Sequence, residues 1–169
     1  MKPGEQQTND FMALIKQYER LIHKVCNLYI VNNPEDYKDL YQEIILQTWL
    51  AFPKFQNAAK VSTWLYRIAL NTAISYKRSS KTRINEIPFD DSFTQVADIT
   101  RDSNEEYLLL WGLIRQLPQL EKALILLYLE NNSYEEIAAI MGLTVTNIGT
   151  RLGRIKGKLK KQAQQILVN

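Results

Sequence analysis

The chain of 169 residues has room for one ordinary domain or two small ones, and its 46% hydrophobic content excludes a disordered protein. One cysteine, Cys26, and one histidine, His23, cannot supply the roughly four ligands of a structural zinc site, so no metal or other cofactor is expected. Cys26 lies at an apolar helical position, which favours a buried thiol over a catalytic pair with His23. No phosphate loop or nucleophile elbow occurs, so neither an enzyme nor a small-molecule substrate is indicated. No apolar run could span a bilayer and the start MKPGEQQTND lacks a signal-peptide pattern, so we expect a cytoplasmic protein without membrane insertion.

The net charge of +3 conceals a pattern of blocks along the chain. Residues 60–83 carry +6 without a single acid, residues 84–110 carry −6, and residues 151–169 again carry +6 without an acid. The two acid-free basic blocks, on either side of an acidic segment, indicate where on the chain a polyanion would bind, which the net charge does not.

Apolar side chains from Phe11 to Tyr29 recur at helical spacing and predict an amphipathic helix over residues 9–31. Pro34 opens a second helix that we expect to stop before Pro53. On this second helix Leu40, Ile44 and Leu50 are expected to face inward, while polar side chains gather on the opposite surface, namely Asp39, Gln42, Glu43 and Gln47. The polar surface is either solvated or a docking site for a basic partner helix.

The stretch VSTWLYRIALNTAISYKRSSKTR, residues 61–83, predicts a third amphipathic helix with Ser62 as a suitable N-cap. Its outer face carries cations and short hydrogen-bonding side chains: Arg67, Asn71, Ser75, Lys77 and Arg78. Because asparagine and serine add hydrogen bonding to plain charge, this face suits a polyanion with readable base edges better than an acidic protein. A solvated surface helix is the alternative that this stretch alone leaves open.

Residues 82–104 are acidic, contain Pro88 and show no helical period, so they predict an extended linker. Helices are expected to follow over residues 105–117 and from Pro118 to residue 131.

The segment SYEEIAAIMGLTVTNIGTRLGRIKGKLKK, residues 133–161, has the pattern of two helices and a tight turn. Ser133 and Glu136 form a capping box, Gly142 makes the turn and Thr144 caps the last helix. That helix exposes polar and basic side chains: Thr146, Asn147, Thr150, Arg151, Arg154, Lys156 and Lys158. The arrangement predicts a helix-turn-helix whose second helix enters the major groove, with an αα-hairpin in a bundle as the alternative.

In these motifs and in their order, the chain resembles the extracytoplasmic-function sigma factors, the small two-domain initiation factors of bacterial RNA polymerase. DLYQEIILQTWLAFPKF resembles the polymerase-binding helix of the family, which implies that Asp39, Gln42 and Glu43 contact core polymerase. STWLYRIALNTAISYKR resembles the segment that melts and reads the minus-ten element, which implies that Asn71 contacts its upstream bases. The segment from Leu117 to Lys161 resembles the domain that reads the minus-thirty-five element.

The resemblance also assigns sets of residues. The loop from Phe55 to Ser62 matches the family's loop that holds a flipped base, so the implied minus-ten site comprises Phe55, Asn57, Ser62, Trp64, Arg67, Asn71, Ser75, Lys77 and Arg78. The implied minus-thirty-five site comprises Thr144, Thr146, Asn147, Thr150, Arg151, Arg154, Lys156 and Lys158. The acidic linker resembles the segment that threads the RNA exit path of the polymerase.

Two features depart from the family. Gln56-Asn57 stands where relatives usually have glycine, and Gly149 and Gly153 of the last helix stand where relatives often place a long basic or aromatic residue. With Gly157 they form a stripe at i, i+4 and i+8. The glycines reflect either close packing or drift, or a helix backbone that approaches the DNA closely.

The sequence therefore predicts an all-α protein of two small helical domains, residues 8–81 and 105–166, joined by the linker 82–104. We expect a sigma factor that binds core RNA polymerase and promoter DNA and helps to melt the minus-ten element. The alternatives are a helix-turn-helix regulator that binds duplex DNA without polymerase, and a scaffold module that binds acidic proteins or RNA. In the free state the two domains are expected either to move independently or to be held by an inhibitory anti-sigma factor.

Overall fold

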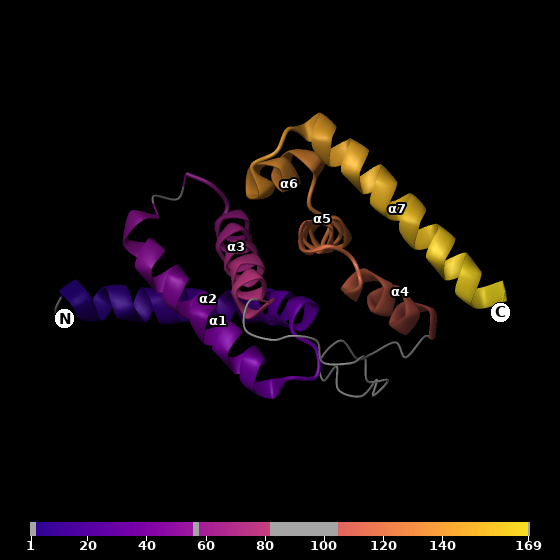
Figure 1. Ribbon diagram of the computed structural model, residues 1–169. Coiled ribbons are helices and arrows are strands. Elements are labelled where there is room, and N and C mark those ends of the chain that lie inside the picture. The colour runs from indigo at the N-terminus through magenta and orange to yellow at the C-terminus, as the bar shows by residue number, and fades with distance from the viewer. Residues whose placement is uncertain (1–2, 56–57, 82–104, 169) are drawn as a thin grey trace. The chain divides into compact units, whose positions relative to one another are not determined.

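The structure, a computed structural model, describes residues 3–55, 58–81 and 105–168, and every regular element among them is helical (Figure 1). In chain order the elements are α1 (Pro3–Tyr29), α2 (Pro34–Ala51), the short 3₁₀ helix η1 (Phe52–Lys54), α3 (Val61–Lys81), α4 (Glu105–Arg115), α5 (Gln119–Leu129), α6 (Tyr134–Met141) and α7 (Val145–Val168). The helices fall into two compact units, α1 to α3 and α4 to α7. The all-α prediction is confirmed, whereas the predicted linker lies outside the described residues. None of the described helices is long and apolar enough to cross a bilayer.

The first unit is a three-helix bundle in which each helix packs against the other two. Its core is built from all three helices, and its members with no exposed surface include Ile22, Val25, Leu40, Ile44, Leu65 and Ala69. At one end of the bundle Phe11 of α1 meets Trp49 of α2 and Phe52 edge-on, with ring centroids 4.9 and 5.4 Å apart. The aromatic contacts fix the start of the long helix α1 against the end of α2.

A short connection joins α1 to α2. After α1 ends at Tyr29, Asn32 adopts a φ of 56°, a left-handed conformation that asparagine tolerates, and the chain turns there. Asn33 then caps α2, since its side-chain oxygen accepts a hydrogen bond from the backbone N–H of Asp36 at 3.0 Å. Pro34 occupies the first turn of α2, as predicted.

Two local predictions were wrong. Leu50 is 59% exposed rather than buried, because the inward stripe of α2 runs through Leu40, Ile44 and Thr48, and a residue two positions further along turns to nearly the opposite side. Ser62 does not cap α3, because the helix already begins at Val61 and the backbone N–H of Trp64 donates to the carbonyl of Lys60.

The second unit contains the predicted helix-turn-helix in α6 and α7 (Figure 1). The capping box is present, because Ser133 accepts from the backbone N–H of Glu136 at 3.1 Å and Glu136 accepts from that of Ser133 at 2.9 Å. Gly142 ends α6 with a φ of 66°, a left-handed conformation that glycine adopts without strain. The hydroxyl of Thr144 accepts from the backbone N–H of Asn147 at 3.2 Å and so caps α7. Ile148, Leu152, Ile155 and Leu159 anchor α7 on the core, as predicted.

The single histidine and the single cysteine both lie within the first unit. His23 joins α1 to α2, since its Nδ1 lies 2.5 Å from the hydroxyl of Tyr37 and its ring stacks on Tyr41 with centroids 4.9 Å apart. Cys26 has no exposed surface, as the sequence predicts for a buried thiol. Both residues are therefore used to hold the bundle together.

Burial of Cys26 predicts an alkaline loss of stability. It raises the pKa of the thiol from an ordinary value of 9.0 to about 12. The unfolded chain releases this proton near pH 9 and the folded chain retains it until about pH 12, so the folded state is favoured most below pH 9. As the pH rises between these values, the free energy of unfolding should fall by about 1.4 kcal/mol per pH unit, measured by denaturant titration at several pH values. The Cys26→Ala variant should show a shallower fall, and a wild-type stability that stays constant from pH 9 to 11 would contradict the prediction.

Candidate nucleic-acid and polymerase interfaces

One face of α3 combines an aromatic platform with cations and hydrogen-bonding side chains. We call it the α3 face; its residues recur every three or four positions and are Trp64, Arg67, Asn71, Ser75 and Arg78. The last four are exposed, and the half-buried Trp64 stacks on Phe55 with ring centroids 4.4 Å apart and an interplanar angle of 27°. Tyr66, by contrast, is only 5% exposed and lies in the core. The first unit therefore offers a surface on which charge, hydrogen bonding and a flat apolar ring occur together.

Not every residue of the predicted minus-ten set lies on the α3 face. Ser62 and Lys77 are half-buried, and by helical geometry both point away from the line of Arg67 and Asn71. Lys77 also interacts with other groups of the protein. Asn57 lies outside the described residues.

The outer side of α2 is partly acidic and partly apolar. Asp39 and Glu43 are followed on the same side by Leu46 and Leu50, at spacings of four, three and four residues. The two leucines are 48% and 59% exposed and, one helical turn apart, form a small apolar patch beside the carboxylates. Gln42 lies exposed beside this row. We call Asp39, Gln42, Glu43, Leu46 and Leu50 the α2 face.

The leucines are the functional candidates that sequence reasoning missed. The hydrophobic pattern assigned Leu50 to the core, because an apolar residue near the end of a helix resembles any other core residue. The signal that could have identified it is the i, i+4, i+7, i+11 spacing from Asp39 through Glu43 and Leu46, which places all four residues on one side of the helix.

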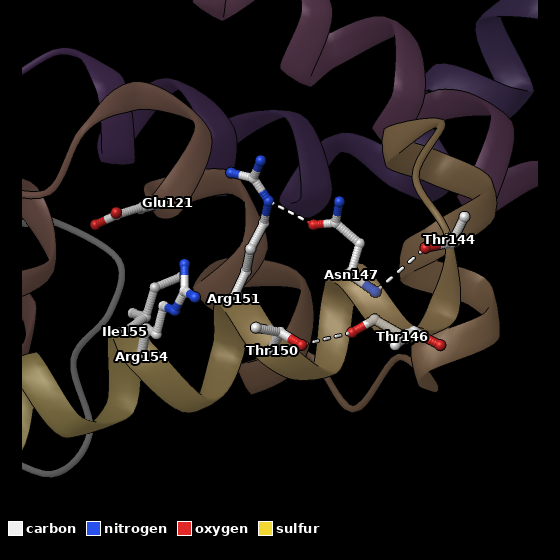
Figure 2. Close-up of a pocket in the computed structure, with 8 residues that line it drawn as sticks. All are labelled: Glu121, Thr144, Thr146, Asn147, Thr150, Arg151, Arg154 and Ile155. Carbon is white, nitrogen blue, oxygen red and sulfur yellow. Dashed lines mark hydrogen bonds between the residues drawn. The ribbon is translucent and has the colours of Figure 1, made fainter.

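The recognition helix α7 lines a pocket together with α5 (Figure 2). The pocket gathers six of the eight residues predicted to bind the minus-thirty-five element, namely Thr144, Thr146, Asn147, Thr150, Arg151 and Arg154. The side chain of Thr150 donates to the carbonyl of Thr146 at 3.0 Å, and Arg151 donates from Nε to Oδ1 of Asn147 at 2.6 Å. These bonds restrict the side chains before any ligand arrives.

The other two predicted residues, Lys156 and Lys158, contact side chains of α5. The ammonium group of Lys156 lies 4.4 Å from the ring centroid of Tyr128. Lys158 lies 3.7 Å from a carboxylate oxygen of Glu121, an acid that the sequence did not single out and that also lines the pocket. Both cations remain exposed, so their contacts orient them without removing them from solvent.

The three glycines of α7 are not required by packing within the unit. A Cβ atom at Gly153 or Gly157 would meet nothing within 4 Å, and one at Gly149 would lie 3.6 Å from the Tyr134 ring, an ordinary contact. Close packing, one of the explanations considered for the stripe, is therefore wrong for Gly153 and Gly157 within this unit.

The open position at Gly153 predicts a stabilising substitution. Gly153→Ala should raise the free energy of unfolding of the second unit by about 0.5–1 kcal/mol, because alanine loses less backbone entropy in a helix. Gly142→Ala is the matched control with the opposite sign, since its φ of 66° strains an alanine. Denaturant melts of the two variants test both signs, and destabilisation by Gly153→Ala would show that the position is not open in solution.

The fold and these faces define an all-α protein with a DNA-binding helix-turn-helix, and comparison with known proteins narrows the class. Sigma-70 region 2 matches residues 14–83, and Sigma-70, region 4 matches residues 107–159. The chain is 34% identical to the RNA polymerase sigma factor YlaC of Bacillus subtilis (strain 168), over 75% of this chain and 77% of that protein. It is 29% identical to the ECF RNA polymerase sigma-E factor of Escherichia coli (strain K12), over 99% of this chain and 92% of that protein.

Two solved structures share the fold. One is CnrH in complex with the cytosolic domain of CnrY, with a TM-score of 0.66 and 20% identity over 94% of this chain and 90% of that one. The other is the sigma factor RpoE in complex with the anti-sigma factor NepR from Bartonella quintana, with a TM-score of 0.68 and 18% identity over 92% of this chain and 97% of that one.

The chain belongs to the RNA polymerase sigma factors of the extracytoplasmic-function (ECF) type. It is a non-catalytic polymerase subunit that binds core RNA polymerase and DNA and directs promoter recognition. The resemblance stated from the sequence motifs is confirmed, and the regulator that binds duplex DNA without polymerase is the less favoured interpretation.

Proposed function

We propose a division of labour between the two units. Residues 8–81 bind core polymerase through the α2 face and hold the melted minus-ten element on the α3 face. Residues 105–166 read the minus-thirty-five element through α7, and residues 82–104 connect the two inside the transcribing complex. The protein acts in the cytoplasm, where the polymerase works. The observation that carries the proposal is that the stacked rings of Phe55 and Trp64 belong to the first unit, whereas the recognition helix α7 belongs to the second.

The chemistry of the α3 face fits a single strand better than a duplex. Every base has a flat π-face, so a stacked pair such as Phe55 and Trp64 can receive an unstacked base of any identity. Asn71 and Ser75 supply donors and acceptors for base edges, and Arg67 supplies charge for the phosphates. Extruding a base costs a few kcal/mol, which stacking and phosphate contacts on this face offset.

The α2 face fits a basic helix of the polymerase that carries apolar side chains. Asp39 and Glu43 provide charge complementarity, while the exposed Leu46 and Leu50 provide apolar area to bury at the centre of the contact.

The recognition helix fits the major groove of the minus-thirty-five element. Thr146 and Thr150 lie in its first two turns, where base edges come within reach. Arg154, Lys156 and Lys158 continue toward its C-terminal part, where phosphates follow the groove. The two solved structures that share the fold contain a bound CnrY domain and a bound anti-sigma factor, and we include an anti-sigma factor among the partners of this chain.

Transcription in vitro with sigma-free core polymerase on a pool of randomised promoters tests the division. The wild type should produce start sites that share two spaced motifs. Asn71→Ala should relax only the motif nearer the start site, and Thr150→Ala, at a position assigned to base edges, only the distal motif. If both variants altered the same motif, the division between the units would be wrong. If no transcripts appeared and the protein did not co-purify with core polymerase, the polymerase role itself would fall.

A further inference from the structure

Asn147 and Arg151 of α7 are joined by a side-chain hydrogen bond. Nε of Arg151 donates to Oδ1 of Asn147 at 2.6 Å, a short bond between residues one helical turn apart. The backbone of Asn147 is itself fixed, because its N–H donates to the capping hydroxyl of Thr144. Figure 2 shows the two side chains meeting on one side of α7, with the terminal nitrogens of Arg151 pointing away from Asn147.

The bond limits what Asn147 can read. An asparagine recognises adenine by accepting from N6 through Oδ1 and donating to N7 through Nδ2 at the same time. Arg151 takes one of the two lone pairs of Oδ1 and fixes the amide, so Asn147 can offer an adenine its donor and the remaining lone pair only in the orientation that this bond sets. Asparagine at the start of a recognition helix would otherwise predict adenine at the facing position.

The same bond prepares Arg151. Its Nε is already used, so the two terminal nitrogens remain as a planar pair of donors held in one orientation. Within the described residues Arg151 forms no ion pair with an acid, and the neighbouring carboxylate of Glu121 lies against Lys158 instead. The guanidinium is therefore charged, oriented and available on the pocket side of α7.

We propose that Asn147 is a positioning residue and that Arg151 is the reader, binding two adjacent acceptors on the promoter. That chemistry occurs in two places on DNA: the O6 and N7 atoms of a guanine, and two oxygens of a phosphate. The inference rests on the proposed function of α7. It adds that the acceptor pair is contacted by Arg151, and that Asn147 contributes orientation rather than adenine recognition.

The test is a set of double-mutant cycles between protein and DNA, using the complete chain assembled with core polymerase. Competition binding compares wild type, Arg151→Ala, Asn147→Ala and Asn147→Asp on a promoter selected by the wild type. In one arm each guanine of the minus-thirty-five element is replaced singly by 7-deazaguanine, which lacks N7. In the other arm each phosphate is replaced singly by a methylphosphonate. Lys160→Ala, which removes an exposed cation of the same helix, measures the effect of charge alone.

Arg151→Ala should weaken binding about tenfold to a hundredfold if it reads a guanine, and one 7-deazaguanine should weaken the wild type but not this variant. If the acceptors are phosphate oxygens, one methylphosphonate, rather than one 7-deazaguanine, should weaken binding of the wild type but not of Arg151→Ala. Asn147→Ala should weaken binding by about twofold to tenfold, because the Arg151 side chain must then be ordered on binding. It should also reduce the coupling energy between Arg151 and the modified guanine or phosphate. Asn147→Asp should keep the coupling, since a carboxylate also accepts from Nε.

Two results would overturn the proposal. One is an Arg151→Ala variant whose losses on modified DNA equal those of the wild type at every position. The other comes from a third arm, in which each adenine of the element is replaced singly by purine, which lacks the N6 amino group. A replacement that weakens the wild type but not Asn147→Ala would make Asn147 an adenine reader. Failure of the wild type to select any promoter would instead refute the proposed function, so the two failures are distinguishable.

Discussion

Replacing Leu50 by lysine should weaken assembly with core polymerase at least about 30-fold while leaving the first unit folded. The side chain is 59% exposed in the free chain, so its removal uncovers no core. Lysine is a good helix former, and a cation near the C-terminus of α2 interacts favourably with the helix dipole. In the complex, the substitution removes an apolar anchor and places a positive charge where we propose a basic partner. Hot-spot losses of 2 kcal/mol or more correspond to at least about a 30-fold weaker Kd.

The matched control is Val31→Lys. Val31 is 46% exposed and precedes α2, so it lies at the opposite end of that helix, roughly 25 Å from Leu50 along its axis. Affinity for core polymerase, measured by fluorescence anisotropy of labelled protein, should be unchanged by this variant. Equal affinity of Leu50→Lys and wild type would remove the apolar part of the α2 face from the interface, whereas equal losses in both variants would indicate a non-specific charge effect.

Replacing Trp64 by alanine should block promoter opening without preventing polymerase binding. The substitution removes one ring of the pair with Phe55, and base stacking on aromatic side chains contributes about 1–3 kcal/mol per base. Open complexes on a duplex promoter, measured by permanganate reactivity of unpaired thymines, should fall about tenfold or more. Affinity for core polymerase should stay at the wild-type level, because Trp64 is on α3 and the α2 face is on α2.

Two comparisons separate stacking from other causes. Trp64→Phe keeps a flat ring beside Phe55 and should retain most of the opening activity. A promoter with a mismatched bubble over the minus-ten element removes the cost of unpairing, so the defect of Trp64→Ala should shrink on it. A defect of the same size on both templates would indicate that Trp64 supports the fold of the unit, a role that its half-buried position also allows.

Much of the molecule follows from short-range pattern. The 3.6-residue period locates the seven α-helices of the described residues, although α1 begins at Pro3, ahead of the predicted residue 9, and the 3₁₀ helix η1 was not predicted. The Ser133–Glu136 box, Gly142 and Thr144 define the helix-turn-helix because capping and left-handed turns depend on neighbouring residues alone. The exposed side of α3 is predicted for the same reason, since Arg67, Asn71, Ser75 and Arg78 share a periodicity with each other.

What the sequence by itself determined is therefore the set of α-helices, the caps of the helix-turn-helix, the two-unit organisation and the membership of the sigma factors. The tertiary structure decided which apolar residues are core and which side chains are already occupied. Leu50 is exposed because the two helices that pack on α2 cover only one of its sides, and an apolar period does not reveal where that cover ends. Asn147 gives its acceptor to Arg151, and Lys156 lies over Tyr128, because rotamers respond to neighbours that only folding brings together.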